Sequence, residues 1–253
     1  MNTRLVTRIR VEAPIASFRY PFFLIGRQVS YDMPPPSTIY GHIATVLGEL
    51  PEPASVQFGY HFTYAAKGQD LEHQQIIYAG GAKFEQDGVN YPTSVQGTVQ
   101  PHLRDFLFQP RLTLYLDGEQ WAEIFQNPVF CVALGRSQDL ASITKVEKVK
   151  LEPANDAYFE QTLLPFSWRG RVGRGTTVQM PRYIEPPPER FPHFDRYVAL
   201  RERVFDSEDP TISVGLRILR GFGRQTDANP HWVDPESPAI HGMRRGVVFH
   251  SFQ

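Results

Sequence analysis

Three consecutive prolines, Pro34–Pro36, followed at once by Ser37, constrain the fold more than any other feature of the chain. Each proline ring removes a backbone donor and biases the preceding residue toward an extended conformation, so no helix runs through this segment. Beyond it, apolar residues recur at helical spacing until Pro51. The hydroxyl of Ser37 suits an N-cap, which predicts that a helix begins there. Such a helix start has free amides and a partial positive charge that can hold a phosphate, although the pattern alone favours an ordinary capped helix.

Composition excludes several classes of protein. The 253 residues are enough for one large domain or two small ones. Cys131 is the only cysteine, so a disulfide framework and a cysteine-based metal site are excluded. No stretch approaches the roughly 20 apolar residues of a membrane span, and Arg10, Glu12 and Arg19 interrupt the region where a signal sequence would lie. We expect a cytoplasmic protein with no cofactor, no metal and no membrane partner.

The charged residues indicate local anion sites on a protein whose net charge is only −1. Arginines outnumber lysines by 21 to 5, and the arginine fork suits bidentate phosphate contacts and protein interfaces alike. Two segments that lack acids, 167–182 and 211–226, concentrate these side chains. The arginines concerned are Arg169, Arg171, Arg174 and Arg182 in the first segment and Arg217, Arg220 and Arg224 in the second. Solvent-exposed arginine-rich faces are the alternative interpretation.

The periodicity of the chain predicts an α+β fold. Strands are expected at 5–12, 56–64, 112–116 and 129–134, and helices at 37–50 and 121–126. The resulting order, βαββαβ, is that of the ferredoxin-like unit, which RNA-recognition domains also use. We therefore predict an RRM-like domain over residues 1–150. Residues 151–253 are rich in proline and are predicted to form a small region of short strands and loops packed on that domain.

An insertion of over forty residues, about 68–109, separates the second and third predicted strands. Connections of this length are usually functional, and a disordered segment is the alternative. Asp87-Gly88 can form a tight hairpin turn, which predicts a projecting β-hairpin, or thumb. The residues assigned to this thumb are Lys83, Phe84, Asp87, Gly88 and Tyr91.

Four segments, in this order, resemble one known family. They are Val11–Phe18 (VEAPIASF), 34–41 (PPPSTIYG), Leu103–Leu116 (LRDFLFQPRLTLYL) and Leu134–Leu140 (LGRSQDL). Together they are similar to the Cas-five family, the RAMP-type subunit of type I CRISPR surveillance complexes (Cascade), with type I-B the most similar branch. The resemblance covers about residues 3–150.

The resemblance implies a function in RNA binding. Members of this family hold the five-prime handle of the CRISPR RNA, cap one end of the complex and contact a Cas-eight family large subunit and a Cas-seven family backbone subunit. Target DNA is reached through the complex, and the thumb folds over the RNA. The candidate RNA contacts near the matching segments are Arg27, Ser30, Ser37, Thr38, Tyr40 and Arg136. Arg169, Arg171, Arg174 and Arg182 are added on charge alone.

Two other functions remain open at this point. One branch of the family cleaves the CRISPR RNA precursor without a metal, using a tyrosine, a lysine and a histidine. The chain has eight histidines, His61 and His73 among them, but no adjacent lysine–histidine pair in the insertion. A protein-only scaffold whose arginines pair with acidic partners is the second alternative, and the salt dependence of RNA binding would distinguish it. We favour a subunit that binds RNA without cleaving it.

Overall fold

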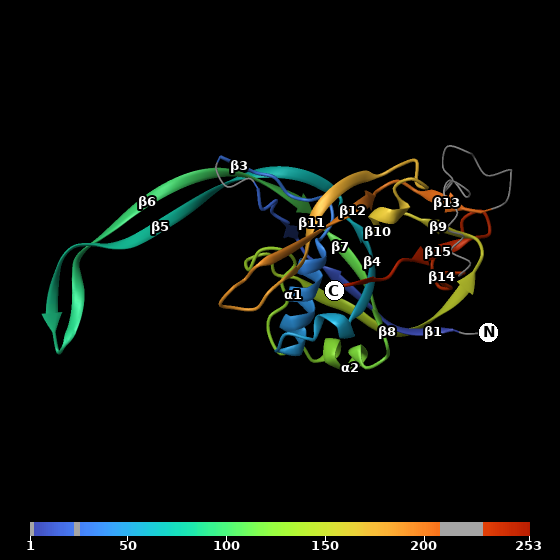
Figure 1. The fold of residues 1–253 in the computed structure, drawn as a ribbon, viewed down its shortest axis with the longest axis horizontal. Helices are drawn as coiled ribbons and strands as arrows, with labels where there is room; N and C mark the ends of the chain where they lie inside the picture. The colour runs from blue at the N-terminus through green and yellow to red at the C-terminus, as the bar shows by residue number, and fades with distance from the viewer. Residues whose placement is uncertain (1–2, 23–25, 208–229) are drawn as a thin grey trace.

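The computed structural model describes residues 3–22, 26–207 and 230–253. These residues form a body made mostly of strands, from which two long strands extend as an arm (Figure 1). The expectation of a mixed α and β fold is therefore confirmed. Within the described ranges, no helix is both long and apolar enough to cross a membrane.

Four strands and two helices form the centre of the body. In chain order they are β1 (Arg4–Glu12), α1 (Pro36–Leu47), β4 (Gln57–Thr63), β7 (Arg111–Asp117), α2 (Trp121–Gln126) and β8 (Ser142–Ala154). The strands lie in the order β8-β1-β7-β4, and each neighbouring pair is antiparallel. Since cross-strand partners share a face, Ile9, Leu114 and Tyr60 lie on one side of the sheet, and Arg10 and His61 lie on the other.

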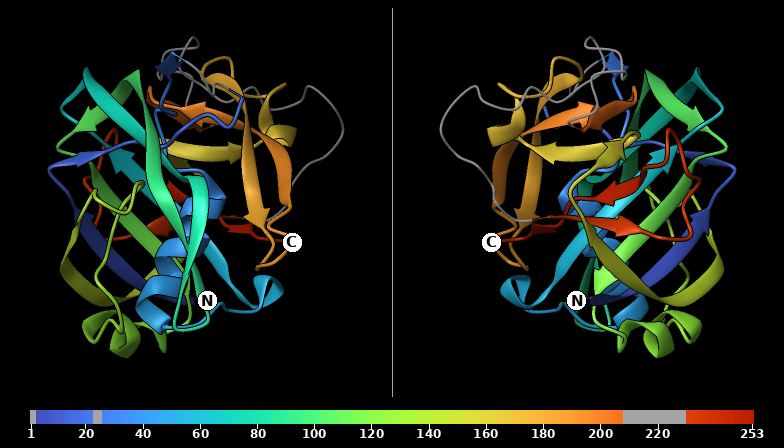
Figure 2. Two further views of the ribbon diagram at one scale, coloured as in Figure 1. Left: turned by 90° about the vertical axis from the view of Figure 1, so that its left-hand side faces the viewer. Right: turned by 90° about the vertical axis from the view of Figure 1, so that its right-hand side faces the viewer.

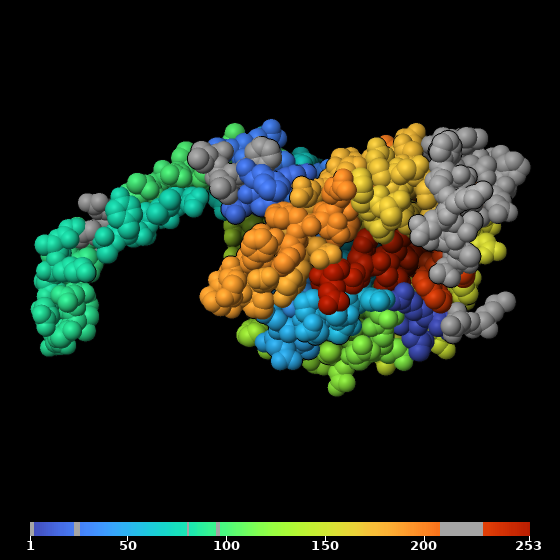
Figure 3. All heavy atoms as spheres, in the orientation of Figure 1, coloured from blue at the N-terminus to red at the C-terminus, as the bar shows by residue number. Residues whose placement is uncertain are grey.

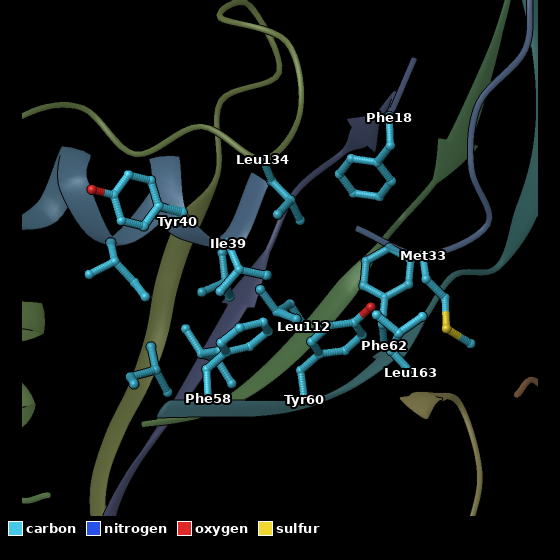
Figure 4. Packing of buried hydrophobic residues seen from close by; sticks show 14 of the residues in the cluster. Phe18, Met33, Ile39, Tyr40, Phe58, Tyr60, Phe62, Leu112, Leu134 and Leu163 are labelled. Atoms are coloured by element: carbon cyan, nitrogen blue, oxygen red, sulfur yellow. The ribbon is translucent and has the colours of Figure 1, made fainter. Parts of the chain in front are cut away.

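The apolar side of this sheet packs against α1. Ile39 of the helix is fully buried together with Phe58 and Phe62 of β4, so the aromatic side chains of the strand predicted at 56–64 are part of the core (Figure 4). Leu112 of β7 and Leu163 from the C-terminal part of the chain fill the same cluster. The largest of the hydrophobic clusters in the body therefore draws on both halves of the sequence.

The start of α1 differs from the prediction. The helix begins at Pro36, Pro35 occupies the N-cap position, and no side chain makes a capping hydrogen bond. The prediction that Ser37 is the N-cap is therefore wrong, because the fixed φ of proline is already suited to the first helical position. The helix also ends before Pro51, since Gly48 adopts a left-handed φ of 86° and its N–H bonds to the carbonyl of Ala44.

The predicted strand at 129–134 is also wrong. This apolar segment is a loop whose backbone bonds to the end of α1, with Val129 N–H donating to the Val46 carbonyl at 3.0 Å. Burial of Val132 and Leu134 against the helix accounts for their apolar character. The strand that pairs with β1 is instead β8, whose alternating charged residues reflect its largely exposed position.

The remaining short strands build outward from this centre. β9 (Ala157–Phe159), β13 (Val204–Asp206), β14 (His231–Asp234), β15 (Arg244–Val247) and β16 (His250–Ser251) extend it to nine strands in the order β13-β9-β15-β14-β8-β1-β7-β4-β16. A separate sheet contains β10 (Thr162–Pro165), β12 (Pro192–Leu200) and β11 (Thr176–Ile184), and short turns of 3₁₀-helix lie at η1 (Pro53–Ser55) and η2 (Phe166–Trp168). Figure 2 shows β14 and β15 on the side of the sheet away from α1. The boundary predicted at residue 150 lies inside β8.

The insertion between β4 and β7 is one long hairpin, β5 (Ala66–Gln86) and β6 (Val89–Phe108), which we call the arm. At about 3.3 Å per residue, its 20-residue strand is roughly 65 Å long, counting the part at its base that belongs to the body. Asp87 and Gly88 form the turn with φ values of 52° and 75°, as a two-residue hairpin turn requires. At its base, β2 (Ile15–Ala16) and β3 (Arg27–Gln28) pair with β6. Figure 3 shows the rest of the arm projecting clear of the body.

Candidate nucleic-acid interface

A groove of about 490 Å³ lies where the start of α1 meets the base of the arm. Three of the predicted RNA contacts, Ser37, Thr38 and Arg136, line this groove together. Segments that are distant in the sequence supply the remaining walls: Ser17, Phe18, Arg19, Pro21, Pro35, Glu72, Arg104, Gly135, Ser137, Gln138, Pro181 and Ile184.

One buried carboxylate fixes the loop that carries Arg136. Asp139 accepts hydrogen bonds from the backbone N–H groups of Ser17 at 3.1 Å and Arg136 at 3.2 Å. It also accepts a bidentate contact from the Arg136 guanidinium, with Nη2 to Oδ1 at 2.8 Å and Nε to Oδ2 at 3.0 Å. Gly135 has a φ of 109°, and a Cβ there would lie 2.7 Å from the Ser17 carbonyl oxygen, so the loop requires glycine. Arg136 therefore shapes the groove while its own charge is neutralised.

A second ion pair joins this loop to the arm. Arg104 on β6 pairs through Nε with Glu72 on β5, and Arg136 Nη1 lies 3.4 Å from the same carboxylate oxygen. Burial alone would raise the pKa of Glu72, but the hydrogen bond and charge of Arg104 and the charge of Arg136 outweigh it and lower this pKa. Glu72 is thus ionised at neutral pH and anchors the arm to the groove.

Arg19 is the cation in the groove that remains available for a ligand. Its side chain is exposed, and among the described residues it has no acidic partner. The groove contains the guanidinium groups of Arg19, Arg104 and Arg136. The carboxylates of Glu72 and Asp139 balance two of these charges, so one net positive charge remains. The hydroxyls of Ser37 and Thr38, both half-buried, lie on the same groove. One cation with neighbouring hydroxyls can hold a phosphodiester oxygen.

The helix itself offers fewer donors than the sequence suggested. Pro35 and Pro36 have no N–H groups, and the N–H of Thr38 bonds to the Pro35 carbonyl at 2.9 Å. In the first turn, only the Ser37 amide lacks a partner among the described residues. Anion binding here would therefore depend on side chains more than on the helix end.

Other predicted contacts lie outside the groove. The Ser30 hydroxyl is buried, accepts a hydrogen bond from the Phe18 N–H and donates one to the Tyr31 carbonyl, both at 2.9 Å. The Tyr40 hydroxyl is also buried and donates to the carbonyl of Pro51. Both side chains are thus engaged in packing. Arg27 is exposed on β3, beside the base of the arm, and its guanidinium lies 3.3 Å from the Asp105 carboxylate.

The four arginines predicted on charge alone do not line the groove either. Three of them follow η2, and the fourth is on β11. Their contacts are Arg169 to the Val172 carbonyl at 3.4 Å, Arg171 over the Trp168 ring at 5.2 Å, Arg174 with Glu202, and Arg182 to Asp195 at 3.9 Å. The arginines predicted in the second segment, Arg217, Arg220 and Arg224, lie outside the described residues.

At the tip of the arm, Phe84 and Tyr91 face each other across the hairpin. Their rings stack with centroids 5.5 Å apart, and both side chains are nearly half exposed. Lys83, the residue before Phe84 on β5, is exposed as well, and because successive strand residues alternate, it lies on the opposite face of the hairpin. The tip therefore presents an aromatic pair on one face and a positive charge on the other.

A second cavity, of about 320 Å³, lies on the side of the sheet away from α1. His61 lines it beside Arg245, and burial, reinforced by that positive charge, lowers the pKa of His61 to about 3. This histidine is neutral at physiological pH and so is a poor proton donor. Arg8 in the same cavity is buried and pairs with Asp234 at 2.8 Å and Glu147 at 2.8 Å. Among the described residues, no group of three or more His, Cys, Asp or Glu side chains could hold a metal ion.

Sequence reasoning missed Arg19 and Arg104 as groove residues, and Asp139 as the carboxylate that fixes the Arg136 loop. Arg19 directly follows the VEAPIASF segment, and Arg104 and Asp139 lie inside two of the other matching segments. A signal for them was therefore present. What the sequence could not show is that β5 and β6 bring Glu72 and Arg104 to the start of α1.

The fold and the groove define a sheet-rich α/β protein with a small basic groove at the foot of a projecting arm. A family model described as CRISPR-associated protein (Cas_Cas5) matches residues 7–190. The chain therefore belongs to this family of CRISPR-associated proteins. No curated protein matches it.

The solved structures that match the chain share little sequence with it. One from a "CRISPR RNA-guided surveillance complex" is 15% identical with a TM-score of 0.38, covering 57% of this chain and 62% of that one, so the match spans under two thirds of that chain. A "Cas protein" crystal structure is 13% identical with a TM-score of 0.33, covering 78% and 95%. A chain of a Type III-B Cmr-beta complex bound to target RNA and AMPPnP is 9% identical with a TM-score of 0.43, covering 78% and 86%.

Proposed function

We propose that this chain is an RNA-binding subunit of a type I CRISPR ribonucleoprotein in the cytoplasm. It holds the five-prime handle of the CRISPR RNA in the groove and caps one end of the complex. The observation that carries this proposal is Arg19, which has no acidic partner among the described residues, beside the hydroxyls of Ser37 and Thr38 at the foot of the arm, in a member of a CRISPR-associated family. Phosphate contacts of this kind position a strand, and its unpaired bases remain available for recognition.

The finer architecture belongs to the same proposal. The order β8-β1-β7-β4, with every neighbouring pair antiparallel, supports a ferredoxin-like unit. The PPPST segment at the start of α1 supports type I-B as the subtype. The arm would act as the thumb that lies over the RNA and joins the Cas-seven family backbone subunit, with the Cas-eight family large subunit as the other protein partner and target DNA reached through the complex.

We also propose that the subunit does not cleave RNA. His61 supports this view because its lowered pKa makes it a poor acid, and because it lines the second cavity rather than the groove. The purified chain should therefore leave precursor CRISPR RNA intact with or without divalent metal. Site-specific cleavage that disappeared in H61Q or H73Q would contradict this part of the proposal.

The groove assignment can be tested by reversing its charge. The double variant S37E/T38E places two carboxylates beside Arg19 and should weaken binding of a single-stranded RNA copied from the host CRISPR repeat by more than tenfold through repulsion. T45E, near the other end of α1, is the matched control and should bind as the wild type does. Wild-type affinity in the double variant, with an unchanged melting temperature, would contradict the groove assignment.

A further inference from the structure

The central sheet has an edge that is unpaired along most of one strand. On one side, residues 142–151 of β8 pair with β1, but on the other side β14 pairs only with residues 152–154. Within the described ranges, no further backbone segment bonds to 142–151 on that side. Alternate residues of an antiparallel strand point their N–H and C=O groups away from its partner. This stretch, which we call the β8 edge, can therefore accept another strand.

A mainly apolar trough of about 740 Å³ lies beside the first half of the β8 edge. Its walls come from α2 and the loop that follows it, and from residues 141–146. The two walls meet where the Ala141 N–H bonds to the Val132 carbonyl at 2.9 Å. On the loop wall, Val129 and Phe130 are 59% and 60% exposed. Apolar side chains that remain open to solvent beside an unpaired strand can be covered by a partner.

The second half of the β8 edge is positively charged. Three of the five lysines in the chain, Lys145, Lys148 and Lys150, lie on β8. Lys145 pairs with Glu147 at 2.6 Å, whereas Lys148 and Lys150 are exposed and have no acidic partner among the described residues. Because Val146, Lys148 and Lys150 occupy alternate positions, they lie on one face of the sheet.

The pattern of charge and apolar surface distinguishes between possible occupants. Lysines on an edge strand prevent two such edges from pairing, which disfavours a second copy of this chain. A nucleic acid is also disfavoured, because the carbonyl groups of the edge repel phosphate and the trough offers it no donor side chains other than Ser142, Thr144 and Lys145 at one wall and Gln126 at the other. An extended protein segment satisfies both the N–H and the C=O groups of an open edge, and its side chains can be apolar at one end and acidic at the other.

We propose that the β8 edge binds an extended segment of a protein partner, which adds a strand to the sheet. The segment places apolar side chains in the trough and acidic side chains opposite Lys148 and Lys150. The trough shares no lining residue with the groove proposed for RNA, so this inference does not depend on RNA binding.

The first test measures peptide binding to the full chain by fluorescence anisotropy. Two fluorescein-labelled peptides, TETETVTV and TVTVTETE, present glutamate and valine on one face in the two possible strand directions. One of them should bind, and its form N-methylated at every residue should bind at least tenfold more weakly, because it has no backbone donors.

Charge reversal tests the chemistry of the partner. K148E/K150E should weaken binding of the same peptide by about tenfold or more, because attraction becomes repulsion. R10E/R111E is the matched control, since it reverses two exposed charges on the opposite face of the same sheet, and it should bind the peptide as the wild type does. S37E/T38E should also bind the peptide normally, whatever its affinity for RNA, so the groove assignment and this inference can fail separately.

The second test uses the complex purified with its native partners. In hydrogen–deuterium exchange, the amides of 144–150 that do not bond to β1 should exchange at least tenfold more slowly in the complex than in the free chain. K148E/K150E should lose this protection, and R10E/R111E should keep it.

Several results would overturn the proposal. They include failure of both peptides to bind, equal peptide binding by the wild type and K148E/K150E, and unchanged exchange of 144–150 in the complex. Protection of 144–150 by the repeat RNA alone would assign the edge to nucleic acid instead. Protection that increases with the concentration of the free chain would assign it to a second copy.

Discussion

The body and the arm place their apolar residues in opposite ways. Phe58 and Leu114 in the body are completely buried. On the arm, Leu71, Val99 and Ile77 expose 55%, 59% and 68% of their surface, and the strand register puts all three on one face of the hairpin. The body is therefore stabilised by its own core, whereas the arm is held by its hydrogen-bond ladder. A two-stranded hairpin is only marginally stable alone, so the arm depends on what it contacts.

The largest effect that this comparison predicts is at Arg8 in the body. Replacing this buried guanidinium in R8L leaves the buried Asp234 carboxylate without its charged partner and removes one of the two cations that pair with Glu147. Breaking a buried ion pair in this way should cost about 3–5 kcal/mol of unfolding free energy, measured by urea denaturation. R111L is the control. Arg111 is exposed and its ion pair with the exposed Glu12 is long, at 3.9 Å, so its loss should change the unfolding free energy by less than about 0.5 kcal/mol. Similar losses of unfolding free energy in R8L and R111L would contradict the claim that the buried ion pair stabilises the body more than the exposed one.

The pH dependence of the body gives an intermediate effect. Burial lowers the pKa of His250 to about 4, and burial with the charge of Arg245 lowers that of His61 to about 3. The unfolded chain, with a histidine pKa near 6.5, binds more protons below that pH, so stability is complete above about pH 6.5 and falls as the pH drops toward 4.

Each of these two histidines should contribute up to about 1.4 kcal/mol per pH unit to that loss. Unfolding free energies measured from pH 6.5 to 5 should show a smaller slope in H61Q and in H250Q. A slope that is the same in the wild type, H61Q and H250Q would contradict the assignment of the loss to buried histidines.

The smallest effect on stability is expected at the tip of the arm. Phe84 and Tyr91 contact each other but lie outside the body core, so F84S/Y91S should alter the melting temperature of the body by no more than a degree or two. Trypsin should cut the free chain at Lys83, and assembly with partner subunits should protect this bond. Equal cutting rates in the free and the assembled chain would show that the arm contacts no partner.

Sequence reasoning succeeded where local chemistry decides the structure. The alternation in β4 and the Asp87-Gly88 turn are both local patterns, and the structure shows a buried aromatic face and a hairpin turn at these places. It failed at 129–134, where Val132 and Leu134 are buried, Val129 and Phe130 are exposed, and the segment bonds to the end of α1 as a loop, because a short apolar run gives the same pattern as a buried strand. The groove was only partly predicted. Glu72 and Arg104 lie 32 residues apart in the sequence, and only the pairing of β5 with β6 brings both to the groove.

The most direct test of the central claim is the identity of the RNA that the chain binds in its host. A tagged chain, purified with its native partners and treated to release nucleic acid, should yield RNAs that share one five-prime segment derived from the CRISPR repeat. The double variant S37E/T38E, expressed at the same level, should recover much less of this RNA. Recovery of unrelated cellular RNA, or of equal amounts by both proteins, would contradict the account.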